Sequence, residues 1–193
     1  MTKKIMFNDK YCLTRAVLKG RKTMTRRVLK EGTPLGNWEE TARHLPYKVG
    51  DIVAIAQSYE VVYAEMIADF IRHNYHFPRE DAAEKFKKVY ESYDGWKDKM
   101  FVKAELMPHH IRIKDIKVER LQDISDEDIM REGVWQIYHN NEVFYVPKNI
   151  GYAPTVAFPS ARLAFWYLID KISGKGTWES NPFVVAYSFK LVD

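Results

Sequence analysis

The segment Gly20–Arg27 gathers the side chains best suited to bind an anion. It reads Gly-Arg-Lys-Thr-Met-Thr-Arg-Arg, so one lysine, two threonines and three arginines fall within eight residues. Residues 1–30 contain ten Lys or Arg and a single acid, Asp9, whereas the whole chain has a net charge of only +4. The positive charge is therefore local, and such a field attracts phosphate or another anion. The residues expected to contact that anion are Arg21, Lys22, Arg26 and Arg27.

Two pairs of histidines do not indicate a metal site. His109 and His110 are adjacent, so on a strand their rings point to opposite faces. His73 and His76 have helical spacing, but no nearby carboxylate or cysteine completes a ligand set. We therefore expect no metal and no cofactor.

Length and composition are those of a globular domain. The chain has 193 residues, of which 46% are hydrophobic and 29% charged, and one domain of this size can bury a sizeable core. Cys12 is the single cysteine, which excludes an intramolecular disulfide and fits a reducing compartment. The apolar run near the N-terminus is too short for a signal peptide, and no stretch approaches the ~20 apolar residues of a membrane span. We expect a cytoplasmic protein.

The elements around the basic segment can be predicted from local signals. Residues 3–7 are expected to form a short strand, and a helix capped by Asn8 or Asp9 should end at Gly20. Residues 31–48 are rich in Gly, Pro and polar groups and predict a long loop. Residues 52–56 predict a buried strand.

Later segments mix helices and strands without βα alternation. Apolar residues at helical spacing in 63–93 predict two helices divided at Pro78, and alternation in 110–121 predicts one or two strands. Ser125 should begin a short helix that Gly133 closes, and Ser160 a longer last helix. Asn140-Asn141 between apolar runs predicts a hairpin, and alternation over 183–191 predicts a terminal strand. The pattern favours an α+β fold around a mainly antiparallel sheet or barrel.

Five segments, in order, resemble the ASCH family, whose small domains belong to the PUA-like β-barrel superfold. The first is Gly20-x-Lys22-x-x-x-x-Arg27, directly after the first helix. The other four are the Gly-Asp strand at 49–53, the strand that begins at Val118, the acidic helix that ends at Gly133, and the closing strand that follows Trp178. The closing strand resembles that of phage-type members, and Met107-Pro108 and Arg112 resemble the same subgroup. The resemblance implies a single domain over 1–193, with insertions at about 63–106 and 135–159.

Short bacterial members of this family include amidohydrolases that deacetylate N4-acetylcytidine. The resemblance implies a lysine base, a threonine nucleophile and a glutamate proton donor, which correspond to Lys22, Thr25 and Glu132. An amide carbonyl requires an activated nucleophile, and neighbouring arginines should lower the pKa of a lysine toward a useful range. Lys22 and Thr25 are three apart, so a regular strand would send them to opposite faces. This mechanism therefore needs a turn or bulge between them.

Three functions follow as hypotheses. The first is RNA, nucleotide or nucleoside binding in a basic cleft, to which the resemblance adds Gln57, in place of a family glutamate, and Arg112. The second is the N4-acylcytidine amidohydrolase. The third is an accessory protein that binds a protein partner through the helical insertion at 63–93. In the third case that insertion should carry an exposed apolar stripe.

Overall fold

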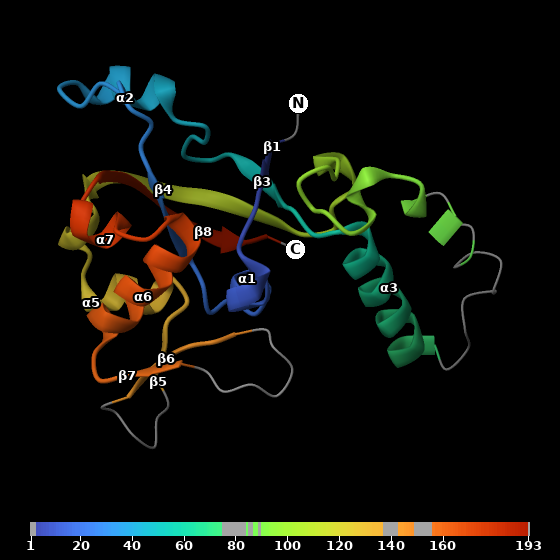
Figure 1. The fold of residues 1–193 in the computed structure, drawn as a ribbon. Helices are drawn as coiled ribbons and strands as arrows, with labels where there is room; N and C mark the ends of the chain where they lie inside the picture. The colour runs from blue at the N-terminus through green and yellow to red at the C-terminus, as the bar shows by residue number, and fades with distance from the viewer. Residues whose placement is uncertain are drawn as a thin grey trace. The chain divides into compact units, whose positions relative to one another are not determined.

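The computed structural model describes residues 3–74, 84, 87–88, 90–136, 143–148 and 156–192, and shows a mixed α+β fold (Figure 1). The chain divides into two compact units. Unit 1 contains Met1–Phe7 and Ile52–His110, and unit 2 contains Asn8–Asp51 and Ile111–Val192. The predicted insertion at about 63–106 thus falls in unit 1, and the insertion at 135–159 falls in unit 2.

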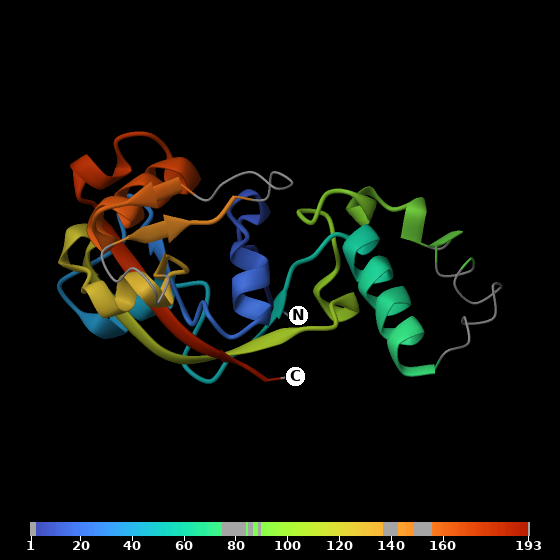
Figure 2. The same cartoon turned by 90° about the horizontal axis from the view of Figure 1, so that it is seen from below.

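The centre of unit 2 is an antiparallel arrangement of three strands. The last strand, β8 (Phe183–Leu191), pairs on one side with β2 (Met24–Val28) and on the other with β4 (His110–Arg120). Figure 2 shows β4 and β8 running side by side as long curved ribbons. A bulge interrupts their register between Ile113 and Asp115. Among the described residues, the strand pairings do not close into a barrel.

Two short helices flank β2, and both end at a glycine with positive φ. A 3-10 turn at Asp9–Tyr11 leads into α1 (Leu13–Leu18), after which Gly20 has φ 69°. Helix α5 (Asp126–Arg131) begins where the Ser125 side chain accepts a hydrogen bond from the Asp128 amide, and Gly133 follows it with φ 105°. Glycine takes this conformation at little cost, so both predicted helix ends are confirmed.

The C-terminal part of unit 2 packs a long helix against a small sheet. Helix α6 (Ala161–Ser173) begins at its Ser160 cap and is followed by α7 (Thr177–Ser180). Strands β5 (Trp135–Gln136), β6 (Phe144–Val146) and β7 (Val156–Phe158) pair antiparallel in that order. Both β6 and β7 contact α6, and the figures show them beside it (Figures 1 and 2). The hairpin turn predicted at Asn140-Asn141 lies outside the described residues.

The prediction of a continuous loop over 31–48 was wrong, because α2 occupies Trp38–His44. This helix depends on end effects more than on apolar periodicity. The Asn37 side chain accepts a hydrogen bond from the Glu39 amide at 2.8 Å. Glu39 and Glu40 lie in the first turn, and Arg43 and His44 in the last, where each charge favours the helix dipole.

Unit 1 contains the one parallel strand pair among the described residues. Strand β1 (Lys3–Ile5) runs parallel to β3 (Ile52–Ile55). Helix α3 (Tyr59–Asn74) follows β3, and 3-10 turns form at Asp94–Trp96 and Ala104–Leu106.

The core of unit 1 is built around the buried Tyr59. Its ring lies 4.9 Å from that of Tyr90, measured between centroids, and packs with Ala54, Val102 and Met107. A Cβ atom at Gly95 would approach the Tyr59 ring to 2.7 Å, so only glycine fits there without a shift. The helix break predicted at Pro78 lies outside the described residues.

None of the helices in the described part of the chain combines the length and the apolar character needed to cross a membrane.

Candidate functional site

Lys22 of the basic segment lies inside unit 2, with only 2% of its surface exposed. Its Nζ donates three hydrogen bonds. The acceptors are the Met24 carbonyl at 2.7 Å, the Glu132 carbonyl at 2.8 Å and the Glu132 Oε2 at 2.7 Å. Three donors is the full capacity of an ammonium group. Lys22 therefore ties the start of β2 to the end of α5 through a residue 110 positions away in the sequence.

Arg26 uses its guanidinium in the same way, and it is also buried. Its Nε and Nη2 donate to Glu119 Oε1 at 3.0 and 2.6 Å, and Nη2 also donates to Asp128 Oδ2 at 2.9 Å. Its Nη1 donates to Glu132 Oε1 at 3.2 Å and lies 3.1 Å from the Met24 sulfur. Five contacts occupy the five N–H donors of an arginine. A phosphate would have to displace a carboxylate to reach this side chain.

We call Lys22, Arg26, Glu119, Asp128 and Glu132 the buried ion cluster. It pairs two cations with three carboxylates, and the exposed Lys117 adds a further cation 2.5 Å from Glu119 Oε2. Arg131 Nη1 adds another, 3.0 Å from Asp128 Oδ1, so four cations surround the three carboxylates. A buried network of this kind is tolerated when each charge has partners, and it becomes costly as soon as one partner is removed.

The pKa of Lys22 is lowered from its ordinary value. Burial is the largest cause, because it disfavours the charged ammonium. The ion pair and hydrogen bond with Glu132 act in the opposite direction, while the positive charges of Arg27 and Arg26 lower the pKa further. The direction agrees with the prediction. The dominant cause differs, since burial contributes more than the neighbouring arginines.

Local backbone geometry brings Glu132 to the lysine. The Thr23 amide donates to the Arg131 carbonyl at 3.0 Å, and Arg131 Nε donates to the Thr23 hydroxyl at 3.2 Å. The left-handed turn at Gly133 then reverses the chain, with Leu13 Cδ2 only 3.1 Å from where a Cβ would be. The end of α5 is thus fixed against the start of β2, and both the carbonyl and the carboxylate of Glu132 face the ammonium.

Thr25 lies on the opposite face of β2 from Met24 and Arg26, as strand alternation requires. It is buried, and its partner in the ladder is Tyr187 of β8. Burial raises the pKa of Tyr187 to about 12, and the ring of Tyr47 packs edge-on against it at 5.3 Å between centroids. The structure therefore brings together Lys22 and Glu132 from the predicted triad and places Thr25 in a different environment.

Two arginines of the basic segment remain at the surface. Arg27 is exposed at the outer end of β2. Arg21 is also exposed, and its guanidinium carbon lies 4.3 Å from the centroid of the Trp135 ring. An arginine stacked on an indole presents both a charge and a flat surface. The predicted set of four contacts thus separates into an inner pair, which is engaged in the ion cluster, and an outer pair that faces solvent.

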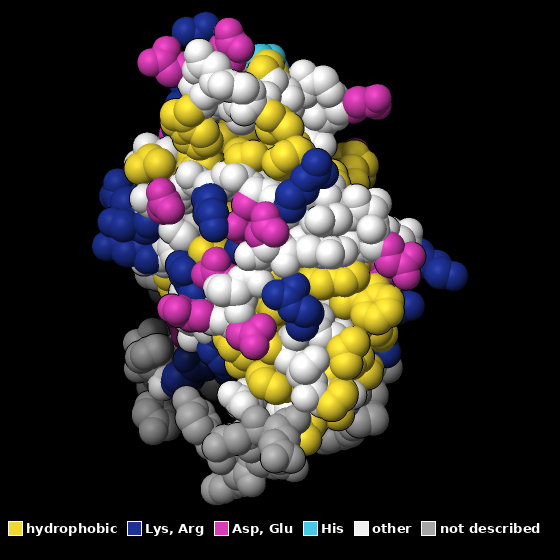
Figure 3. All heavy atoms as spheres, turned by 90° about the vertical axis from the view of Figure 1, so that its left-hand side faces the viewer, with side chains coloured by type: hydrophobic (Ala, Val, Ile, Leu, Met, Phe, Trp, Pro, Cys, Tyr) yellow, Lys and Arg dark blue, Asp and Glu magenta, His cyan; other side chains and the backbone are white. Residues whose placement is uncertain are grey.

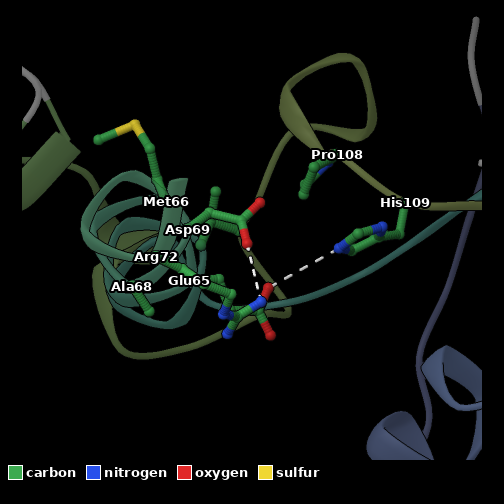
Figure 4. Close-up of a pocket in the computed structure, with 8 residues that line it drawn as sticks. Glu65, Met66, Ala68, Asp69, Arg72, Pro108 and His109 are labelled. Atoms are coloured by element: carbon green, nitrogen blue, oxygen red, sulfur yellow. Dashed lines mark hydrogen bonds and ion pairs between the residues drawn. The ribbon is translucent and has the colours of Figure 1, made fainter. Parts of the chain in front are cut away.

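The other two predicted ligand contacts lie elsewhere. Arg112 is half-buried on β4, opposite Lys190 in the ladder. Gln57 belongs to unit 1, where its buried side chain donates to Glu65 Oε2 at 2.9 Å. Glu65 in turn lines a pocket of about 480 Å³ beside α3, with its Oε2 3.8 Å from His109 Nε2 (Figure 4).

The walls of this α3 pocket are charged as well as apolar. Asp69 and Arg72 of α3 form an exposed ion pair at 3.2 Å on one side, as the dashed line in Figure 4 marks. Val61 and Met66 leave 42% and 38% of their surfaces exposed on the same helix. The side chain of His73 and the whole of His76 lie outside the described residues. A partner-binding role for this insertion stays a prediction.

Glu119 and Asp128 are the members of the cluster that the sequence did not single out as site residues. Glu119 sits in a strand whose charged positions look solvated in sequence. Asp128 is one of three acids in the first turn of α5, a position that helix capping already explains. The signal that could have found them is the excess of carboxylates over 119–132 in a chain whose basic residues gather at its start.

Comparison of the chain with family models, with curated proteins and with solved structures gives no match. In the described residues, no group of three His, Cys, Asp or Glu side chains is placed to hold a metal ion. The site thus combines a buried ion cluster, whose charged groups are paired with one another, with an exposed arginine stacked on a tryptophan.

Proposed function

We propose that this protein binds RNA or a nucleotide through the outer side of its basic segment, where Arg21 and Arg27 face solvent. The observation that carries the proposal is the stack of Arg21 on Trp135 at 4.3 Å. A stacked guanidinium can donate to a phosphate while its flat face and the indole contact a base. Lys22 and Arg26 then act indirectly, because the ion cluster fixes the shape of the segment that carries Arg21 and Arg27.

The family resemblance supports the same proposal. An ASCH-like domain with a PUA-like barrel would be expected to recognise RNA or a modified nucleoside, and the segment Gly20–Arg27 is one of the five segments that together carry the resemblance. We include membership of this family and the barrel architecture in the proposal.

Binding of a fluorescein-labelled RNA oligonucleotide, followed by anisotropy over a range of salt concentrations, tests the proposal. Each phosphate contact to single-stranded nucleic acid contributes about 0.7 to the slope of log K against log salt concentration. Replacing Arg21 and Arg27 together by alanine should therefore weaken binding and reduce that slope by roughly 1.4. The matched control is Arg15→Ala with Arg43→Ala, which removes two exposed arginines from α1 and α2. If both double variants bind as the wild type does, the proposal is wrong.

A second candidate is the amidohydrolase, and one observation favours it. Lys22 Nζ and Glu132 Oε2, two of the three groups of the predicted triad, are 2.7 Å apart in a buried environment that lowers the pKa of the lysine. Deacylation would require Lys22 to give up a hydrogen bond and the Thr25 hydroxyl to reach the same side of β2. The purified protein should then release acetate from N4-acetylcytidine. That release should disappear in Thr25→Ala, whereas Thr23→Ala, which changes the residue directly before β2, should retain it.

A further inference from the structure

An aromatic hollow lies on the solvent side of α6, away from the basic segment in sequence. Phe158, Leu163, Trp166 and Tyr167 line it, and its volume is about 390 Å³. Leu163 and Trp166 leave 39% and 37% of their surfaces exposed, whereas Ala164, Phe165 and Leu168 on the other side of the helix are buried in the core. Figure 3 views the side of the molecule on which α5, α6 and α7 are drawn, and it shows hydrophobic side chains gathered beside Lys and Arg.

Trp166 is held in place by a chain of hydrogen bonds. The Asp170 carboxylate accepts from the Gly176 amide at 3.0 Å and from the Trp178 amide at 2.9 Å, and the Trp166 side chain donates to it as well. Burial acts to raise the pKa of Asp170, but these donors outweigh it and the pKa is lowered. The acid is thus ionised, and the hydrogen bond that it accepts from Trp166 orients the indole.

Tyr167 is fixed in a similar way and is surrounded by lysines. Its ring packs at 5.2 Å from Phe158 and at 6.4 Å edge-on from Tyr11, measured between centroids. Lys148 and Lys171 place their Nζ atoms 5.7 and 5.5 Å from the centroid of the same ring. Lys171 and Lys175 are the two cations of the lining, and Asp170 is the one acid there. Among the described lining residues, positive charge therefore exceeds negative charge around two oriented aromatic rings.

We propose that this hollow, the α6 groove, binds one nucleotide unit of a single-stranded nucleic acid. The base stacks on Trp166 and Tyr167, and the neighbouring phosphates contact Lys171 and Lys175. Aromatic platforms within a cationic groove are the combination that single-stranded nucleic acid requires. The volume is within the range of pockets for small ligands. An apolar protein segment would bury Lys171 and Lys175 beside a single acid, Asp170, which disfavours that occupant.

This proposal goes beyond the proposed function, because it assigns a second surface with different residues. The test is the binding of a fluorescein-labelled oligouridylate, measured by anisotropy. A length of about ten nucleotides is within the range of site sizes of domains that bind single-stranded nucleic acid. Because the stacking of one base on an aromatic ring contributes to the binding free energy, Trp166→Ala should weaken binding by tenfold or more. Trp38→Ala, which removes an exposed tryptophan from α2, should have no effect. Equal affinity of the two variants would overturn the proposal.

The salt dependence of binding tests the contribution of Lys171 and Lys175 separately from that of Trp166. Lys171→Ala with Lys175→Ala should reduce the slope of log K against log salt concentration by roughly 1.4, whereas Trp166→Ala should leave the slope unchanged. Lys114→Ala with Lys190→Ala removes two exposed lysines from β4 and β8 and serves as the matched control. A salt slope that falls equally in both lysine variants would show that the charge acts at long range and not in the groove.

Binding of AMP distinguishes a failure of the α6 groove proposal from a failure of the proposed function. In saturation-transfer NMR, its base protons should report contact with the wild type and with Arg21→Ala, but not with Trp166→Ala. Trp166→Phe keeps an aromatic ring and should retain part of the signal, and thermal unfolding of each variant checks the fold. If only the arginine variants weaken oligonucleotide binding and AMP gives no signal, the groove is overturned and the proposed function stands. If the wild type binds neither ligand, both proposals are overturned.

Discussion

The buried ion cluster and the α6 groove use the same kinds of cation in opposite circumstances. Lys22 and Arg26 are almost completely buried, and every donor they carry meets an acceptor of the protein itself. Lys171 and Lys175 stand at the exposed edge of an aromatic hollow. Part of the densest run of positive charge in the sequence is thus paired with carboxylates inside the protein. Lys171 and Lys175, which no sequence motif distinguishes, are more accessible to solvent than Lys22 and Arg26.

The most severe way to test this contrast is to remove one cation from each region. Arg26→Ala removes the cation that Glu119, Asp128 and Glu132 share, and breaking buried ion pairs in this way costs roughly 3–5 kcal/mol of unfolding free energy. Lys171→Ala changes only an exposed side chain, so the expected loss is below about 0.5 kcal/mol. Urea denaturation of both variants measures the difference. Similar stabilities would mean that the cluster is solvated in solution.

A double-mutant cycle on Lys22 and Glu132 sharpens the same point. Lys22→Met leaves Glu132 with Arg26 as a partner but without its closest cation, and Glu132→Leu leaves the buried Lys22 without its carboxylate. Each should cost about 3 kcal/mol or more. The double variant should recover much of that loss, because apolar side chains of similar size can replace a buried ion pair. Denaturant unfolding gives all four corners of the cycle. If the two single effects simply add, the direct contact between these side chains does not determine their energetics.

The glycine after α5 should have a smaller but distinctive effect. Gly133→Ala forces a Cβ into a left-handed backbone and to 3.1 Å from Leu13, so we expect a loss above the roughly 1–2 kcal/mol of the backbone term alone. Gly20→Ala is the matched control, since Gly20 also has positive φ but nothing lies within 4 Å of its added Cβ. Thermal unfolding compares the two. Equal losses would show that Leu13 moves aside freely.

The face of β2 opposite the cluster gives the smallest effect, and it depends on pH. Because the pKa of Tyr187 is about 12 in the folded protein and about 10 when unfolded, folding favours the neutral phenol. The stabilisation is fully present below about pH 10 and is lost as the pH rises through about 12. Unfolding free energy measured at about pH 9 and pH 11 should therefore fall less in Tyr187→Phe than in the wild type. An unchanged pH dependence would place this phenol in contact with water.

Local signals predicted the fold well where a single residue determines an element's end. Gly20, Ser125, Gly133 and Ser160 all lie at the helix ends assigned to them. The short helix α2 was missed, because its stability comes from a cap and from charges at its ends and not from a repeating apolar face. A sequence pattern also does not say how far strands separated along the chain will pair, so the open arrangement of the described strands could not be predicted.

The candidate site was predictable only in part, for a physical reason. Lys22 and Glu132 were paired through a family resemblance and are in contact, whereas Thr25 follows the alternation of a regular strand to the other face. Whether Arg26 faces solvent or three carboxylates depends on residues about a hundred positions away. The α6 groove could not be predicted, because in the sequence Leu163 and Trp166 look like ordinary apolar positions of a helix. Periodicity does not reveal that a large aromatic residue lies outside the buried stripe.

The pairing of β2 with β8 has a consequence for the order in which the chain matures. The opening basic strand obtains its ladder partner from the last strand, and its counter-ions from residues 119–132. During synthesis, the basic segment therefore leaves the ribosome before the carboxylates of residues 119–132 that pair with it, and β2 obtains its ladder partner later still. Loss of β8 would leave β2 without this ladder partner, although the carboxylates of residues 119–132 would still be present.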